Sequence, residues 1–239
     1  MKRLVLLFSC LFLIGCGDKK EPNESAETGA GPVIDNSTEQ SEGETVATVG
    51  GDDISDLPVL PEEITKEFIM GLWAKPHDGR DLIKELADVS VREGVWKVVI
   101  TTGPDKKEMI HTSEASMIVK MVDRRFQVWQ WSVGEDVEYS FVTYDSDAEK
   151  YRWWGVLADG FIMEWSGRRY WRNLVEWNTV KTSVEGLAMT IRETRIAEDR
   201  KKLEMTGTMK QGDEVVAYRK DEFTWLSELP EEHRLSEVK

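Results

Sequence analysis

Apolar and polar residues alternate with a period of two through most of the chain beyond Gly94, and this alternation is typical of β-strands with one buried face. Ten short β-prone runs follow one another there, at 94–102, 113–122, 125–133, 137–144, 150–157, 160–166, 169–178, 187–197, 201–211 and 214–225. Turn-forming sequences such as Gly134-Glu135-Asp136, Ser166-Gly167 and Gln211-Gly212-Asp213 separate the runs. These connections are too short for parallel crossovers, so neighbouring strands are expected to pair antiparallel.

An open sheet of ten consecutive strands would leave two unpaired edges, which soluble proteins avoid. Closure of the sheet removes both edges. The pattern therefore predicts a mainly β fold, an up-and-down antiparallel β-barrel of about ten strands. A curved half-barrel or a sandwich is the alternative.

Helical spacing replaces the alternation just before the strands. Pro61-Glu62-Glu63 places a proline and two carboxylates in a first helical turn, where the helix dipole favours negative charge. A second helix is expected over 80–88, after the break at Pro76 and Gly79. The apolar residues that would form the buried faces are Ile64, Phe68, Ile69 and Leu72 in the first segment and Leu82, Ile83 and Leu86 in the second. One or two short α-helices should thus precede the barrel.

The N-terminus has the organisation of an export signal. Lys2 and Arg3 are followed by an apolar run that is too short to span a bilayer, and the run ends in Leu13-Ile14-Gly15-Cys16. This ending resembles the bacterial lipobox, in which the cysteine receives a diacylglycerol and becomes the first residue after cleavage. We therefore expect residues 1–15 to be a lipoprotein signal peptide and Cys16 to be lipidated. An ordinary signal peptide is the alternative.

Residues 16–60 differ in composition from the rest of the chain. From Gly17 to Leu60 there are eleven acidic residues, two lysines and no aromatic residue. Such a segment buries too little apolar area to offset the entropy lost on ordering. It is predicted to be a disordered tether, which assigns 61–239 to the β-barrel domain.

The charge balance limits the possible partners. Removal of the signal peptide would leave 29 basic and 45 acidic residues. This excess of negative charge argues against nucleic acid as a partner, because the phosphates of nucleic acids are also negative. It also argues against electrostatic binding to anionic lipids, so the acyl chains at Cys16 would supply the membrane attachment. Gly17 after the cysteine resembles the enterobacterial sorting signal for the outer membrane, which implies a lipid-anchored protein of the cell envelope that faces the periplasm.

Seven tryptophans fall within the 49 residues from Trp129 to Trp177. On the strand pattern, Trp129 and Trp131 share one face, and Trp171 and Trp177 share another. These four residues could line a ligand cavity, with Arg169 as a clamp for a carboxylate. Alternatively, the rings fill the barrel interior, and arginines such as Arg169 pair with glutamates outside.

Several short sequences resemble known barrel families. Gly94-Val95-Trp96 after a short helix resembles the Gly-x-Trp of the calycin group, the lipocalins and their relatives. The segments Asp123-Arg124-Arg125-Phe126, Tyr144-Asp145 to Lys150-Tyr151-Arg152-Trp153, and Tyr218-Arg219-Lys220 are similar to a bacterial lipocalin-like family of unknown function. The resemblance implies an exported, sometimes lipid-anchored barrel and no catalytic residues. The chain departs from the family at Asp123, where a glycine pair is expected.

Candidate chemistry is sparse. The three histidines, His77, His111 and His233, form no metal-binding spacing, and we expect no cofactor; His111 is the one candidate for a haem ligand near a strand. The leading functional hypothesis is a barrel that binds a small apolar or amphipathic ligand. A protein–protein interaction module with a packed barrel and a hydrolase of envelope glycans or lipids are the alternatives.

Overall fold

The computed structural model describes residues 57–77, 81–171, 174–195 and 200–234. It contains two α-helices, ten β-strands and a short 3-10 helix. The helices are α1 (Lys66–Ala74), α2 (Lys84–Val89) and η2 (Glu231–His233). The strands are β1 (Gly94–Gly103), β2 (His111–Val122), β3 (Phe126–Val133), β4 (Asp136–Asp145), β5 (Lys150–Val156), β6 (Ile162–Trp171), β7 (Leu174–Lys181), β8 (Leu187–Arg195), β9 (Lys202–Gln211) and β10 (Glu214–Ser227).

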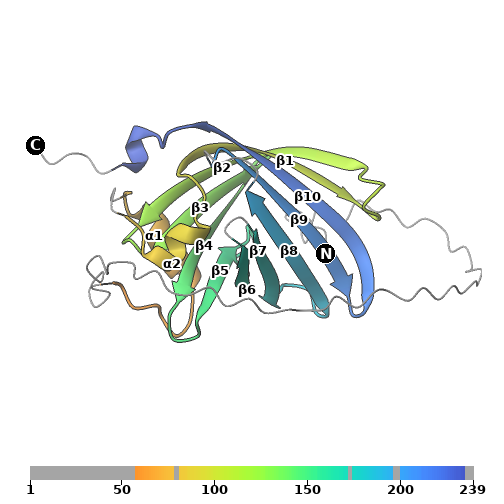
Figure 1. The fold of residues 1–239 in the computed structure, drawn as a ribbon, viewed down its shortest axis with the longest axis horizontal. Helices are drawn as coiled ribbons and strands as arrows, with labels where there is room; N and C mark the ends of the chain where they lie inside the picture. The colour runs from red at the N-terminus through yellow and green to blue at the C-terminus, as the bar shows by residue number, and fades with distance from the viewer. Residues whose placement is uncertain (1–56, 78–80, 172–173, 196–199, 235–239) are drawn as a thin grey trace, which may run out of the picture.

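The ten strands form a closed barrel. Each strand pairs antiparallel with the next one along the chain, and β1 pairs with β10 to close the sheet (Figure 1). The predicted up-and-down antiparallel β-barrel with two preceding helices is confirmed. Among the described residues, no helix is long and apolar enough to cross a lipid bilayer.

Inward-facing side chains from all ten strands form the main hydrophobic core, and α2 covers one end of it. Leu86 and Val89 of α2 are buried against the same cluster as Trp96 of β1. The end of the barrel that α2 covers is called the closed end below, and the opposite end is called the open end. The Tyr151 hydroxyl donates a hydrogen bond to the carbonyl oxygen of Glu85 at 3.0 Å, which ties α2 to the wall.

Helix α1 packs on the outside of the barrel, against β3, β4 and β5 (Figure 1). Ile69 and Leu72 lie in a second apolar cluster with Phe141 and Trp154, whose rings stack at 5.1 Å. Trp153 lies in the main core, so the two tryptophans of β5 lie on opposite faces of the wall. One of the two therefore lies in the lumen, and the other lies outside it beneath α1.

A buried lysine fixes the end of α1. The ammonium group of Lys120, on the outer face of β2, donates to the carbonyl oxygens of Trp73 and Lys75 and lies 4.3 Å from the centre of the Trp73 ring. A cation is favoured at this end of a helix, where the last carbonyl groups lack partners within the helix. Burial lowers the pKa of Lys120 to about 8.

Gly94 allows the first and last strands to approach closely. Its φ of 123° lies in a region that residues with a side chain rarely adopt, and a Cβ at this position would overlap the carbonyl oxygen of Ser227. Two residues later, Trp96 is fully buried and its indole donates a hydrogen bond to the carbonyl oxygen of Arg92 at 2.9 Å. The Gly94-Val95-Trp96 sequence thus has a structural role at the seam between β1 and β10.

The β2–β3 turn contains Asp123 and Arg124 at the place where the resemblance predicts a glycine pair. Asp123 and Arg124 have φ values of 53° and 57°, the left-handed conformation that favours glycine. The turn is held by its neighbours, since the carbonyl oxygen of Arg124 accepts a hydrogen bond from the backbone N–H of Ile83 at 2.9 Å. Lys75 forms an ion pair with Asp123 at 2.5 Å. Contacts with the end of α1 and with the segment before α2 therefore hold this turn in a backbone conformation that is unfavourable for residues other than glycine.

Three predicted boundaries are wrong. The second helix, expected over 80–88, is α2 at Lys84–Val89, and residues 81–83 before it are not helical. The first helix begins after Thr65, whose hydroxyl accepts a hydrogen bond from the backbone N–H of Phe68 at 3.2 Å, rather than at Pro61-Glu62-Glu63. Ser166-Gly167 is not a turn but lies inside β6, which continues to Trp171.

The predicted signal peptide, Cys16 and the tether up to residue 56 lie outside the described residues. Three of the next four residues contact the barrel: Leu57 and Leu60 pack against its apolar clusters, and the carbonyl oxygen of Pro58 accepts a hydrogen bond from Arg125 at 2.5 Å. The folded domain therefore includes residues from at least Leu57, slightly before the predicted boundary at 61.

Candidate ligand site in the barrel lumen

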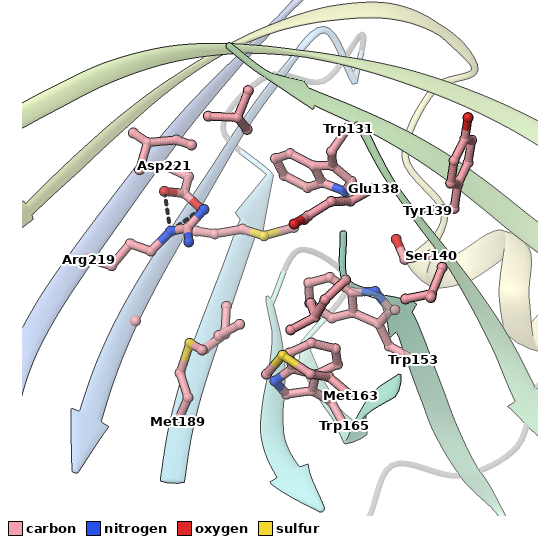
Figure 2. A pocket seen from close by; sticks show the side chains of 18 residues that line it. Trp131, Glu138, Tyr139, Ser140, Trp153, Met163, Trp165, Met189, Arg219 and Asp221 are labelled. Carbon is pink, nitrogen blue, oxygen red and sulfur yellow. Dashed lines mark hydrogen bonds and ion pairs between the residues drawn. The ribbon is translucent and has the colours of Figure 1, made fainter. Parts of the chain in front are cut away.

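The open half of the barrel contains a cavity of about 110 Å³ (Figure 2). One wall is formed by β3 to β6, which contribute Trp131, Ser140, Trp153, Met163 and Trp165, among others. The facing wall is formed by β8 to β10, which contribute Met189, Ile191, Met205, Gly207, Arg219 and Asp221. Most of the lining is apolar, and the polar groups are few, as in sites for small molecules.

Stacked indole rings separate the cavity from the closed end. Trp153 of β5 and Trp165 of β6 are directly paired across the sheet. Their rings stack with centroids 4.5 Å apart and an interplanar angle of 26°. The Trp153 ring also lies 5.2 Å from that of Trp129 and 5.7 Å from that of Trp177. These rings fill the middle of the lumen and so confine the cavity to the open half.

An ion pair lies on the far wall. The Nε–H of Arg219 contacts both carboxylate oxygens of Asp221, at 2.8 and 2.9 Å, and both residues project inward from β10 (Figure 2). Burial raises the pKa of Asp221, and the adjacent guanidinium of Arg219 opposes this shift. The pair places two opposite charges in the cavity wall, so it adds no net charge.

Glu138 is the other carboxyl group of the cavity. It projects inward from β4, and its side chain is only 9% exposed. Burial raises the pKa of Glu138 to about 8; Arg219 and the backbone N–H of Ala158 act against this shift, and the negative charges of Asp136 and Asp159 add to it. Glu138 is therefore mostly protonated and uncharged at pH 7.

Three buried polar groups of the cavity wall lack hydrogen-bond partners among the described residues. They are the indole N–H groups of Trp153 and Trp165 and the hydroxyl of Ser140. The indole N–H of Trp129 shares this property but does not line the cavity. Buried polar groups are nearly always hydrogen-bonded in folded proteins, so these three groups of the β4–β6 wall are exceptions.

The structure brings three of the five predicted ligand-binding residues into the lumen. Trp131 lines the cavity, whereas Trp129 and Trp177 are 1% exposed and form the ring cluster below it. The indole of Trp177 donates a hydrogen bond to the carboxylate of Glu193 at 3.0 Å. One of these three tryptophans therefore lines the cavity, and the other two belong to the packed core.

Trp171 and Arg169 do not line the cavity. Trp171 is 71% exposed, and it ends β6 rather than sharing a strand with Trp177, so the prediction that it points inward is wrong. The cause is the misplaced turn, which assigned Trp171 to the following strand. Arg169 forms an ion pair with Asp88 of α2 at the closed end, a partner that the sequence pattern did not indicate.

Trp153, Trp165 and the polar groups of the cavity wall were not among the predicted site residues. A signal for them was present, since Trp153 alternates with Gly155 on one face of a predicted strand and Gly207 lies on an inward face. Inward glycines beside large rings leave unfilled space within a barrel. Glu138 and Asp221 carried no such signal, because their positions alone do not show burial.

The described residues can be compared with the chemistry considered for the sequence. No group of three or more His, Cys, Asp or Glu side chains that could hold a metal occurs among them. His111 begins β2 and does not line the cavity. Glycoside hydrolysis needs two available carboxyl groups, and Asp221 is engaged by Arg219, which leaves Glu138.

Fold and site together define this protein as a closed ten-stranded β-barrel with a lumenal cavity. No protein-family model and no curated protein matches the sequence. Among solved structures, the chain is similar to a protein of unknown function of the DUF3598 family from Nostoc punctiforme, with 13% identity and a TM-score of 0.39. The match covers 62% of this chain and 50% of that one, so the chain spans about half the length of that structure.

Proposed function

We propose that this protein binds a small apolar or amphipathic molecule in the lumen of its barrel. The observation that carries the proposal is the cavity of about 110 Å³, whose lining is mostly aromatic and aliphatic with a few polar groups. An apolar cavity of roughly 150 Å³ is known to admit benzene. The present cavity is somewhat smaller, at about 110 Å³, so we expect a ligand that buries no more than one small ring in it. The leading alternative is an interaction module whose lumen admits no ligand.

A glycine on the inner face of β9 allows a direct test. A Cβ at Gly207 would lie 3.5 Å from Cβ of Arg219 and 3.9 Å from Sδ of Met189, which is ordinary van der Waals contact. Because Gly207 lines the cavity, we expect the remainder of a leucine side chain at this position to occupy it. We expect ethylbenzene to bind the wild-type protein with a Kd on the order of 0.1–1 mM, as suits a ligand of so few atoms. The variant Gly207→Leu should bind it at least tenfold more weakly, as measured by chemical shifts of the indole N–H groups.

The matched control is Thr206→Leu, because Thr206 is the exposed neighbour on the same strand and points away from the lumen. This variant should bind ethylbenzene as the wild type does. If ethylbenzene, cyclohexane and a polarity-sensitive dye all leave the indole signals of the wild type unchanged, the proposal fails and the packed-barrel alternative takes its place.

We further propose that the barrel is attached to the bacterial cell envelope by acyl chains on Cys16, with the outer membrane facing the periplasm as the expected location. The support is the lipobox-like sequence that ends at this cysteine, together with the acidic composition, which offers no other basis for membrane binding. The variant Cys16→Ala is expected to leave the membrane fraction or to remain unprocessed, as shown by fractionation and intact-protein mass. A processed Cys16→Ala protein that still sediments with membranes would contradict the lipid anchor.

A further inference from the structure

Two hydrogen-bond donors in side chains that line the cavity lack partners among the described residues. The indole N–H groups of Trp153 and Trp165 belong to side chains that are more than nine-tenths buried, and neither has a partner among the described residues. A buried donor without a partner costs a folded protein free energy, which a ligand with a matching acceptor recovers. Figure 2 shows both rings on one wall of the cavity, with Ser140 beside Trp153.

We propose that the lumenal ligand is uncharged and carries a hydrogen-bond acceptor, such as a carbonyl or ether oxygen, that binds to the indole N–H groups of Trp153 and Trp165. This inference rests on the proposed function and adds the chemical class of the ligand. The ligand would lie with its oxygen towards the β5–β6 wall and with its apolar part against Met163, Met189 and Met205 of the lining.

The charge of the lumen supports an uncharged ligand. Arg219 and Asp221 neutralise each other across 2.8 Å. Glu138 is mostly uncharged at pH 7, because burial raises its pKa to about 8. A ligand carboxylate or ammonium group would lose its hydration without gaining a free counterion in this cavity, which is strongly unfavourable.

Ionisation of Glu138 should weaken such a ligand. The charged groups that act on Glu138 are Asp136 on its own strand, Asp159 in the β5–β6 turn and Arg219 on β10, where Arg219 is also paired with Asp221. As the pH rises through about 8, Glu138 loses its proton and places a negative charge in the cavity wall, where an electron-rich acceptor is repelled. Affinity for an acceptor ligand should therefore fall above this pH, and Glu138→Gln should remove the dependence.

The test compares three probes of similar size, namely acetophenone, ethylbenzene and benzoate, on wild-type protein and variants. Acetophenone should move the indole N–H resonances of Trp153 and Trp165, assigned from single Trp→Phe variants, towards the hydrogen-bonded range. Trp165→Phe should weaken acetophenone about five- to tenfold, the loss expected for one hydrogen bond, while ethylbenzene changes less than twofold. Benzoate at pH 7 should bind at least tenfold more weakly than acetophenone.

Trp129→Phe is the matched control, because the Trp129 indole is equally buried and unpartnered but lies outside the cavity lining. It should not alter the ratio of acetophenone to ethylbenzene affinity. If ethylbenzene, cyclohexane and the polarity-sensitive dye all fail to bind, the proposed function fails. If ethylbenzene binds but acetophenone moves neither indole signal and shows no specific loss in Trp165→Phe, this inference alone is wrong. Should Trp165→Phe not fold, the indole shifts and the pH profile of Glu138→Gln decide the question.

Discussion

Replacement of Trp96 by alanine is expected to lower the free energy of unfolding by about 3–5 kcal/mol, the usual loss for a large buried ring. The Trp96 side chain is fully buried where α2 meets the closed end, and its indole hydrogen bond to Arg92 is lost as well. The two residues that pair with it across the sheet, Met117 and Trp225, would then border a void. Urea denaturation followed by far-UV circular dichroism measures the change.

Trp171→Ala is the matched control, because it removes the same side chain from a position that is 71% exposed. Its effect should stay within about 0.5 kcal/mol, as is usual at the surface. A loss below about 1 kcal/mol for Trp96→Ala would show that this residue does not hold the closed end together.

The second large effect is expected from addition of a single methyl group. Gly167 of β6 lies directly opposite Trp177 of β7, and a Cβ at Gly167 would come within 2.5 Å of two ring carbons of Trp177. The indole is rigid, fully buried and bound to Glu193, so it cannot move aside. Gly167→Ala should therefore destabilise the barrel by about 1–3 kcal/mol through overpacking.

Two further variants separate this clash from a general intolerance of the strand. Gly155→Ala, on the neighbouring strand, adds a Cβ no closer than 3.4 Å to any atom and should be nearly neutral. In Gly167→Ala/Trp177→Leu the clash is absent, so the loss should be clearly smaller than the sum of the two single losses. Additive losses in this double variant would show that the ring and the glycine do not conflict.

Much of the fold follows from local pattern. The alternation of apolar and polar residues locates all ten strands, because a barrel wall imposes opposite environments on successive side chains. It also places Trp153 and Trp154 on opposite faces, where α1 covers one and the lumen contains the other. The closing pair β1 and β10 followed from the cost of open edges.

The errors arise where distant residues determine the local structure. Ser166-Gly167 has the composition of a turn, yet the glycine is needed inside a strand because Trp177 occupies the space of its side chain. The cavity depends likewise on which side chains from β4 to β10 meet in the lumen. Neither the burial of Glu138 nor the pairing of Arg219 with Asp221 is encoded in a short sequence window.

The seam between β1 and β10 has a consequence for how the chain folds. Val95 pairs with Ser227, so the barrel closes across a separation of more than a hundred residues. A chain that emerges N-terminus first must keep the edge of β1 unpaired until the last strand arrives, and such edges are prone to aggregation. Closure should consequently be a late and slow step, and a protein truncated before β10 should be a substrate for chaperones rather than a partly folded barrel.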